Sequence, residues 1–167
     1  MISNKGYTAI ELVIGLALIG VLSVLGLVNH LAQKPHNNLR DAGRQIVSQL
    51  RLLRQEAVVE GTSSAIQFMP GDQTFQFVSD GRTVKLPTHI RFGVLEGISE
   101  NPSGDPVPDD GISFSSNKAT FEPNGTYLGV GGAVYLTNAP SRDETLAITV
   151  NMTGRVKLYK WDGSDWQ

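Results

Sequence analysis

Lys5-Gly6-Tyr7-Thr8-Ala9-Ile10-Glu11 opens the segment that decides the fold, and it runs directly into the stretch Leu12 to Val28. That stretch is almost wholly apolar, with Ser23 as its polar exception. A helix over residues 7–28 would rise about 33 Å at about 1.5 Å per residue, enough to cross a hydrocarbon core of about 30 Å. The sequence therefore predicts one transmembrane helix over residues 7–28.

Glu11 places a carboxylate one helical turn into this apolar segment. Such a group costs roughly 2.5 to 3.5 kcal/mol at the bilayer centre on insertion scales, so a lone acid indicates a function there. The alternative is that Glu11 lies at the headgroup boundary and is solvated. A cleaved secretory signal peptide is a second alternative, but the apolar run is longer than an ordinary signal core, and the cleavage site that Asn29-His30-Leu31-Ala32-Gln33 offers is poor.

The start of the chain also carries a family resemblance. Gly6 followed by Tyr7-Thr8-Ala9-Ile10-Glu11-Leu12-Val13 resembles the class III signal of type IV pilins and type II secretion pseudopilins. The resemblance implies that residues 1–6 are a leader peptide, that prepilin peptidase cuts between Gly6 and Tyr7, and that the new amino group of Tyr7 is N-methylated. It further implies that Glu11 meets the amino group of a neighbouring subunit and sets the assembly register, since a buried charge is costly unless it is paired.

A second helical segment is expected over residues 29–61, where it continues the N-terminal helix as an amphipathic spine. Pro35 is expected to interrupt or kink the passage, with Asn37 or Asn38 capping the renewed helix, and Gly61 to end it in a left-handed conformation. Apolar residues recur at spacings of three and four and predict a face that packs on a β-sheet: Leu39, Ala42, Ile46, Leu50, Leu53 and Ala57.

The hydrophobic period changes to two after Gly61, which predicts a β-rich globular head over residues 62–167. The first three strands are expected to form a meander, and Gly129-Val130-Gly131-Gly132 is expected to be a flexible connection. The predicted strands are Ser64 to Met69, Thr74 to Ser79, Thr83 to Leu86, Ile90 to Leu95, Ile112 to Phe114, Ala119 to Glu122, Ala133 to Leu136, Leu146 to Val150 and Val156 to Tyr159.

The second half of the chain resembles the GspH/FimT group of minor pilins and pseudopilins. The resemblance is carried by residues 121–126, 133–138 and 148–156, together with the helical residues 54–58. It implies an α+β, pilin-like fold in which a long N-terminal helix packs on two antiparallel sheets. The residues themselves predict a helix and antiparallel strands, but not the order of the strands.

Composition narrows the classes of function. The 167 residues suffice for one membrane segment and one soluble domain, and the absence of cysteine excludes disulfides and thiolate metal sites. Residues 1–60 carry six basic and four acidic residues, whereas residues 61–167 carry eight basic and twelve acidic residues, a net charge of −4. An acidic head does not favour general nucleic-acid binding.

Arg155, Lys157 and Lys160 are nevertheless a candidate DNA-binding patch beside Tyr159 and Trp161. Some FimT-like minor pilins bind DNA for natural transformation, so the resemblance keeps this alternative open. The opposing interpretation is that Arg155 follows a hairpin glycine, that Lys157 alternates outward on a strand, and that nearby acids neutralise the charge.

Catalytic and metal-binding patterns are weak. Asp105, Asp109 and Asp110 offer oxygen ligands for calcium but lack the spacing of an EF-hand, and a solvated acidic loop is the simpler interpretation. The three histidines show no metal-ligand spacing, and neither a GxSxG nor an HExxH motif occurs. We therefore expect no enzyme, no cofactor and no bound metal.

The expected function is that of a minor pilin or pseudopilin, a structural subunit that initiates or caps a type IV pilus or a type II secretion pseudopilus. The resemblance implies three partners: other pilin or pseudopilin subunits, prepilin peptidase and an inner-membrane assembly platform. It also implies a single-pass inner-membrane protein with a periplasmic head that later enters the filament. A DNA-uptake pilin, a major pilin and a membrane-anchored periplasmic enzyme are the alternatives.

Overall fold

The computed structural model describes residues 9–139 and 144–167, and for residues 20–37 it describes the backbone alone. The predicted leader, with its cleavage residues Gly6 and Tyr7, therefore lies outside the described residues. The chain divides into two compact units, Met1–Lys34 and Pro35–Gln167, and helix α1 (Ala9–Glu60) contributes to both.

Apolar side chains of the first unit are exposed in the isolated chain. Seven of them, between Ile10 and Ile19, are 55% to 70% exposed. Among the described residues, no helix is long and apolar enough to span a membrane. The predicted span, residues 7–28, extends beyond the side chains that the structure describes.

Helix α1 continues through Pro35, so the expectation of a renewed helix capped by Asn37 or Asn38 is wrong. A proline inside a helix removes one backbone hydrogen bond and crowds the preceding turn, and this local loss has not ended the helix here. The end of the helix is as expected: α1 ends at Glu60, and Gly61 adopts a positive φ of 65°.

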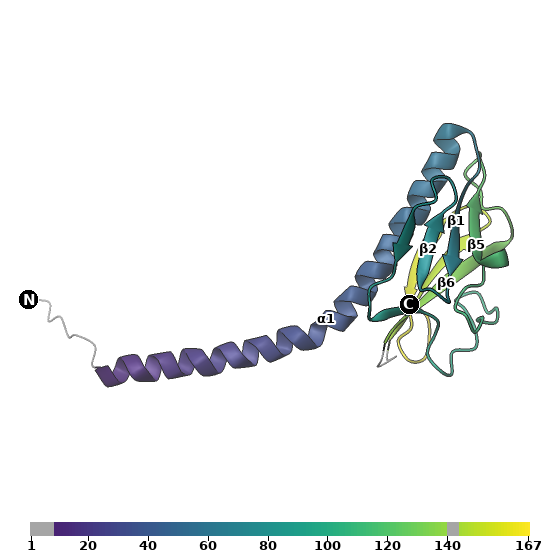
Figure 1. The fold of residues 1–167 in the computed structure, drawn as a ribbon. Helices are drawn as coiled ribbons and strands as arrows, with labels where there is room; N and C mark the ends of the chain where they lie inside the picture. Colours follow the sequence, from purple (N-terminus) through teal and green to yellow (C-terminus); the bar gives the residue numbers. More distant parts are fainter. Residues whose placement is uncertain (1–8, 140–143) are drawn as a thin grey trace, which may run out of the picture. The chain divides into compact units, whose positions relative to one another are not determined.

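The C-terminal part of α1 supplies one side of the core of the second unit. All six residues of the predicted apolar face are at most 3% exposed, which confirms that face. Figure 1 shows this part of the helix running along the β-sheets of the head. The contact is close at Gly43, where an added Cβ would lie 2.9 Å from Leu146 Cδ1 and 3.3 Å from Leu158 Cδ1.

Two antiparallel four-stranded sheets complete the head, with orders β3-β2-β1-β5 and β4-β6-β7-β8. The first three strands form the expected meander, and β5 adds to the free side of β1. The elements are β1 (Ser64–Met69), β2 (Thr74–Phe77), β3 (Thr83–Lys85), β4 (Ile90–Phe92), the 3₁₀ helix η1 (Ser115–Asn117), β5 (Lys118–Phe121), β6 (Gly131–Asn138), β7 (Thr145–Asn151) and β8 (Val156–Lys160).

Two expectations in the head need correction. The segment Ile112 to Phe114 is not a strand, because it makes only an isolated bridge from Ile112 to Val134 before the chain turns into η1. Gly131 and Gly132 begin β6 instead of belonging to a flexible connection. Gly132 lies directly against the Phe114 ring, where a Cβ would collide, so close packing explains this glycine.

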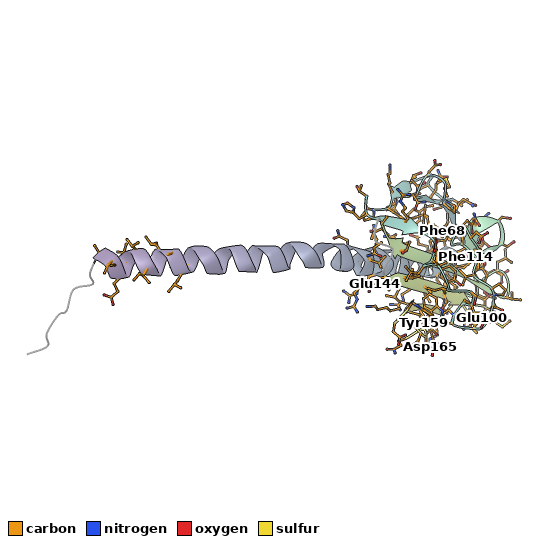
Figure 2. All side chains as sticks on the ribbon, turned by 90° about the horizontal axis from the view of Figure 1, so that it is seen from below. Phe68, Glu100, Phe114, Glu144, Tyr159 and Asp165 are labelled. Atoms are coloured by element: carbon orange, nitrogen blue, oxygen red, sulfur yellow. The ribbon has the colours of Figure 1, made fainter. Side chains whose placement is uncertain are left out.

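Aromatic side chains fill the space between the sheets and the helix. Phe68 from β1 and Phe114 are stacked with ring centroids 5.7 Å apart and planes inclined by 10°, and Figure 2 labels both. Phe92 meets Phe68 edge to face at 5.9 Å. The apolar cluster containing these rings also includes Leu50 and Leu53 of α1, so helix and sheets share one core.

Candidate functional site

Glu11 lies in the first turn of α1 and is exposed. Its neighbours on the helix are the exposed apolar residues Ile10, Leu12, Val13 and Ile14. A carboxylate near a helix N-terminus is favoured by the backbone dipole. The predicted assembly residue is therefore set in an apolar helical surface.

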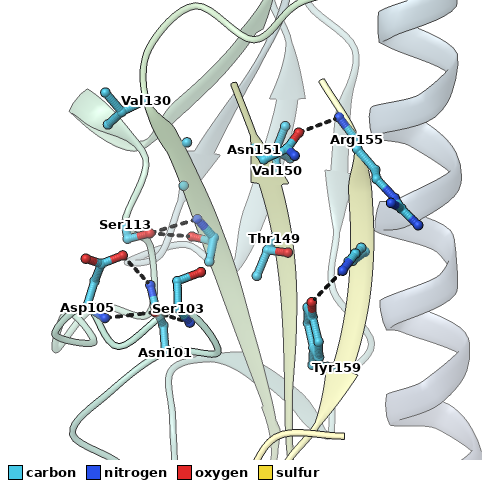
Figure 3. Close-up of a pocket in the computed structure, with 14 residues that line it drawn as sticks. Asn101, Ser103, Asp105, Ser113, Val130, Thr149, Val150, Asn151, Arg155 and Tyr159 are labelled. Carbon is cyan, nitrogen blue, oxygen red and sulfur yellow. Dashed lines mark hydrogen bonds between the residues drawn. The ribbon is translucent and has the colours of Figure 1, made fainter. Parts of the chain in front are cut away.

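A second candidate site is a pocket on the face of β6, β7 and β8 that carries Ala133, Thr149 and Lys157. These three residues are paired in register across the strands. Side chains alternate between the two faces of a strand, so Val134, Ile148 and Val156 point into the shared core while this row points away from it. The loop of residues 99–113 faces the row and closes a cavity of about 460 Å³ (Figure 3).

Arg155 and Lys157 both line this pocket and are exposed. The backbone N–H of Arg155 donates to Asn151 Oδ1 at 2.9 Å, which fixes the turn before β8. The Arg155 guanidinium forms no hydrogen bond or ion pair with any residue that the structure describes. Lys157 Nζ donates to the Tyr159 hydroxyl at 3.1 Å and lies 5.6 Å from the centroid of that ring. Figure 3 shows the Arg155 side chain extending along the outer side of β8, away from Asp105, so Arg155 lies at the edge of the pocket. Among the described residues, neither cation has a carboxylate beside it.

Lys160 lies elsewhere. By strand alternation it is on the opposite face of β8 from Lys157, and its Nζ is 2.7 Å from Glu144 Oε1. The Glu144 side chain is only 4% exposed, so the charge of Lys160 is neutralised by a buried acid. Of the three predicted cations, Arg155 and Lys157 therefore line the same pocket, whereas Lys160 is bound to Glu144 on the other face of β8. Their DNA-binding role stays a prediction that this geometry does not favour.

The opposite wall of the pocket is polar and contains one acid. Asn101, Ser103 and Asp105 belong to the loop, and Figure 3 shows Asp105 across the strands from Arg155. Asp105 Oδ2 accepts a hydrogen bond from Asn101 Nδ2 at 3.2 Å. Of the other predicted calcium ligands, Asp110 accepts from Asn117 Nδ2 at 3.0 Å. Among the described residues, no group of three or more His, Cys, Asp or Glu side chains is arranged to hold a metal ion.

The C-terminal residues hold this loop against the sheet. Trp166 Nε1 donates to the Glu100 carbonyl oxygen at 2.9 Å, and its ring packs against Tyr135 at 6.1 Å between centroids. Gln167 exchanges backbone hydrogen bonds with Lys160 at 2.8 and 2.9 Å. The C-terminal tail therefore packs on the outer face of the sheet through Trp166.

Five polar members of the pocket were not predicted from the sequence: Asn101, Ser103, Ser113, Thr149 and Asn151. Period-two alternation places Thr149 and Lys157 on outward faces of their own strands, but only the register of β7 against β8 makes them neighbours. Asn101 and Ser113 lie on a loop, for which no periodicity exists.

Comparison with known proteins gives the family. The sequence model of the family described as Type II transport protein GspH matches residues 42–154. The chain belongs to the GspH family. The matched residues include most of the buried part of α1 and the first seven strands, which build most of the head of this GspH-family chain. No curated protein matches it.

Solved structures share its fold. The type IV minor pilin FimU of Pseudomonas aeruginosa is similar with a TM-score of 0.54 and 16% identity, over 79% of this chain and 94% of that one. The minor pseudopilin EpsH from the type 2 secretion system of Vibrio cholerae has a TM-score of 0.51 and 13% identity, over 72% and 95%. The expected α+β, pilin-like architecture is therefore confirmed.

Proposed function

We propose that this GspH-family chain is a minor pilin or pseudopilin, a structural subunit that initiates or caps assembly of a type IV pilus or a type II secretion pseudopilus. The observation that carries the proposal is the contrast within α1. Its C-terminal part is buried in the head, whereas seven large apolar side chains between Ile10 and Ile19 are more than half exposed. Such a surface requires an apolar partner.

The partner is first the inner membrane and then the helices of other subunits. Burying one exposed leucine or isoleucine side chain is worth about 1.5 to 3 kcal/mol, so the series from Ile10 to Ile19 supplies the drive for association. This attraction is not directional, and it does not by itself fix how far one helix is offset from the next.

Glu11 fixes that offset. Prepilin peptidase cuts between Gly6 and Tyr7 and exposes an amino group four residues before Glu11, and an inner-membrane assembly platform lifts the processed subunit. The amino group of one chain then meets Glu11 of another inside the apolar bundle. The pairing selects one register, because any other register buries the two charges apart. The work of the protein is therefore structural, and the head faces the periplasm before assembly.

The test replaces Glu11 by alanine in cells that carry the rest of the assembly system. Glu11→Ala is expected to insert and fold normally but to fail to enter filaments, measured by immunoblotting of the membrane and of sheared filaments. Glu11→Asp, which keeps the charge, should restore part of the incorporation. Glu60→Ala removes an exposed acid at the other end of α1 and should have no effect.

If Glu11→Ala enters filaments normally, Glu11 does not set the offset between neighbouring helices. Counting copies in the same sheared filaments distinguishes a minor from a major subunit, since a minor subunit is expected at a few copies per filament.

A further inference from the structure

The pocket on β6, β7 and β8 has the chemistry of a site for an anion that carries a single negative charge. Arg155 and Lys157 line it without an adjacent carboxylate, and Thr149 adds a hydroxyl from the middle strand. Asn151 Oδ1 already accepts from Thr153 Oγ1 and from the Arg155 N–H, so the Asn151 amide nitrogen is its remaining polar atom. That nitrogen makes no hydrogen bond within the part of the chain that the structure describes. Lys157, Thr149 and Asn151 thus place three donor groups on one wall of the cavity, and the exposed Arg155 side chain lies at its edge beside β8 (Figure 3).

The opposite wall limits the kind of anion. Asp105 places a negative charge across the cavity, and a ligand that brings several negative charges would approach it unfavourably. The head as a whole is acidic, and Lys160 is held by Glu144 on the other face of β8. These observations disfavour a nucleic-acid backbone, which carries one charge per nucleotide. They favour a single carboxylate accompanied by hydrogen-bond donors, as in a peptide, for which the Asp105 carboxylate is an acceptor.

Exposed apolar side chains adjoin the same pocket. Val130 lines it and is 89% exposed, and Leu128 and Met152 are each more than half exposed. The three residues lie at one end of the sheet, because Gly131 pairs with Asn151 and the Tyr127 N–H donates to the Met152 carbonyl oxygen at 3.1 Å. We name Leu128, Val130 and Met152 the apolar rim. A polyanion gains nothing from such a rim, whereas a peptide with an apolar residue beside its acid does.

We propose that this pocket binds an acidic side chain of a short peptide segment from a neighbouring subunit, with Arg155, Lys157 and Thr149 holding the carboxylate and the apolar rim holding an adjacent apolar residue. That the segment belongs to a subunit rests on the proposed function; the carboxylate chemistry does not. When the exposed Arg155 side chain turns toward the pocket, a bidentate pair with its guanidinium is the strongest contact available, because both carboxylate oxygens are engaged together.

The test measures peptide binding to the full chain in neutral detergent micelles by saturation-transfer difference NMR. The probe is acetyl-Leu-Glu-Leu-amide, and the matched probe is acetyl-Leu-Gln-Leu-amide, which differs only in the charge. The glutamate peptide is expected to bind about tenfold more tightly than the glutamine peptide, since a hydrogen bond to a charged group adds roughly 1.5 kcal/mol.

Three variants locate the binding. Arg155→Gln and Lys157→Gln are each expected to weaken the glutamate peptide about fivefold or more, as truncating one partner of a charged contact does. Lys85→Gln is the matched control, since Lys85 is an exposed cation on β3 of the other sheet and its loss should change nothing. Asp105→Asn should tighten binding by about two- to threefold, because it removes the opposing charge.

Equal binding of the two peptides, no binding at millimolar concentration, or equal weakening by Lys85→Gln would each overturn the proposal. Displacement of the peptide by a single-stranded 20-nucleotide DNA at equal charge concentration would also overturn it, in favour of a nucleic-acid site. Inorganic phosphate is expected to compete only weakly. None of these results depends on filament assembly, so failure here leaves the Glu11 test intact, and failure of that test leaves the carboxylate site intact.

Discussion

At the scale of single residues, Arg54 and two glycines join α1 to the turns of both sheets. Arg54 Nε donates to the Gly125 carbonyl oxygen at 2.7 Å. Gly154 has a φ of 73°, and a Cβ on it would collide with that same carbonyl oxygen and press on the Arg54 side chain. The helix and the turns on either side of it therefore meet at a point that has no room for a methyl group.

Gly154→Ala is expected to destabilise the protein by about 2 to 4 kcal/mol, from the cost of a left-handed alanine plus the overpacking. Gly61→Ala is the matched control: Gly61 has a φ of 65° with nothing within 4 Å of its Cβ position. It should lose only the conformational cost of about 1 to 2 kcal/mol. Urea unfolding of the full chain in detergent measures both, and equal losses would show that the contact at Arg54 is unimportant.

Tyr135 is a second single-residue test. Its side chain is fully buried, and its hydroxyl has no hydrogen-bond partner. Burial raises the pKa of Tyr135 to about 12, while the nearby Asn101 side chain acts in the opposite direction without making a hydrogen bond of good geometry. Because the folded pKa is raised, the stabilising contribution of the neutral phenol is complete below about pH 10 and is lost as the pH rises toward 12.

Tyr135→Phe is accordingly expected to be neutral or to stabilise by up to about 1 kcal/mol at pH 7, since it removes an unsatisfied buried hydroxyl. Between pH 10 and 12 the variant should lose less stability than the parent chain. Paired unfolding curves at pH 7 and 11 measure this difference. A variant markedly less stable at pH 7 would mean that the hydroxyl makes a favourable contact.

At the scale of elements, the hydrophobic period predicted helices and strands correctly where one face of the element packs against the core. All six residues that spacings of three and four predicted for the α1 face are buried, although Val47 beside them is buried too. Period two located β1 at its observed bounds. The predicted strand from Ile112 to Phe114 is wrong, because an apolar–polar–apolar triplet fits the alternation of a strand even where no partner strand pairs along its length. Lys160 does not join Arg155 and Lys157 in one patch, because its ion pair with Glu144 depends on tertiary contacts that no local sequence pattern encodes.

The α1 face gives a matched pair of substitutions. Leu50→Ala is expected to cost about 2 to 5 kcal/mol, because Leu50 is fully buried and its loss leaves a cavity. Leu52→Ala makes the same chemical change two residues along, where the side chain is 44% exposed, and should cost less than about 1 kcal/mol. Denaturant unfolding compares them. Similar losses would mean that the helix does not pack on the sheets through this face.

At the scale of the whole molecule, two regions of one chain present different surfaces. The head is an acidic β-rich body with its own core, whereas the first part of α1 exposes apolar side chains. The family places the chain among Type II transport proteins of the GspH type, and the fold is shared with minor pilins and pseudopilins. The proposed leader processing belongs to this scale, because it would create the amino group that is proposed to pair with Glu11.

We expect intact-mass spectrometry of the protein from cells with an active prepilin peptidase to show a chain that begins at Tyr7 and carries one methyl group. Cells without the peptidase should yield the chain from Met1. A mature chain that still begins at Met1 in the presence of the peptidase, or one trimmed beyond Asn29, would contradict the proposed processing.

The attachment of Trp166 and Gln167 to the sheet has a practical consequence for handling this protein. Because the Trp166 indole donates to Glu100 and the Gln167 backbone pairs with Lys160, the last two residues support the loop that walls the carboxylate pocket. Carboxypeptidase trimming of those two residues would remove the Trp166 hydrogen bond to the loop without touching Arg155 or Lys157. Preparations for ligand work should therefore be verified for an intact tail before a missing interaction is ascribed to the pocket itself.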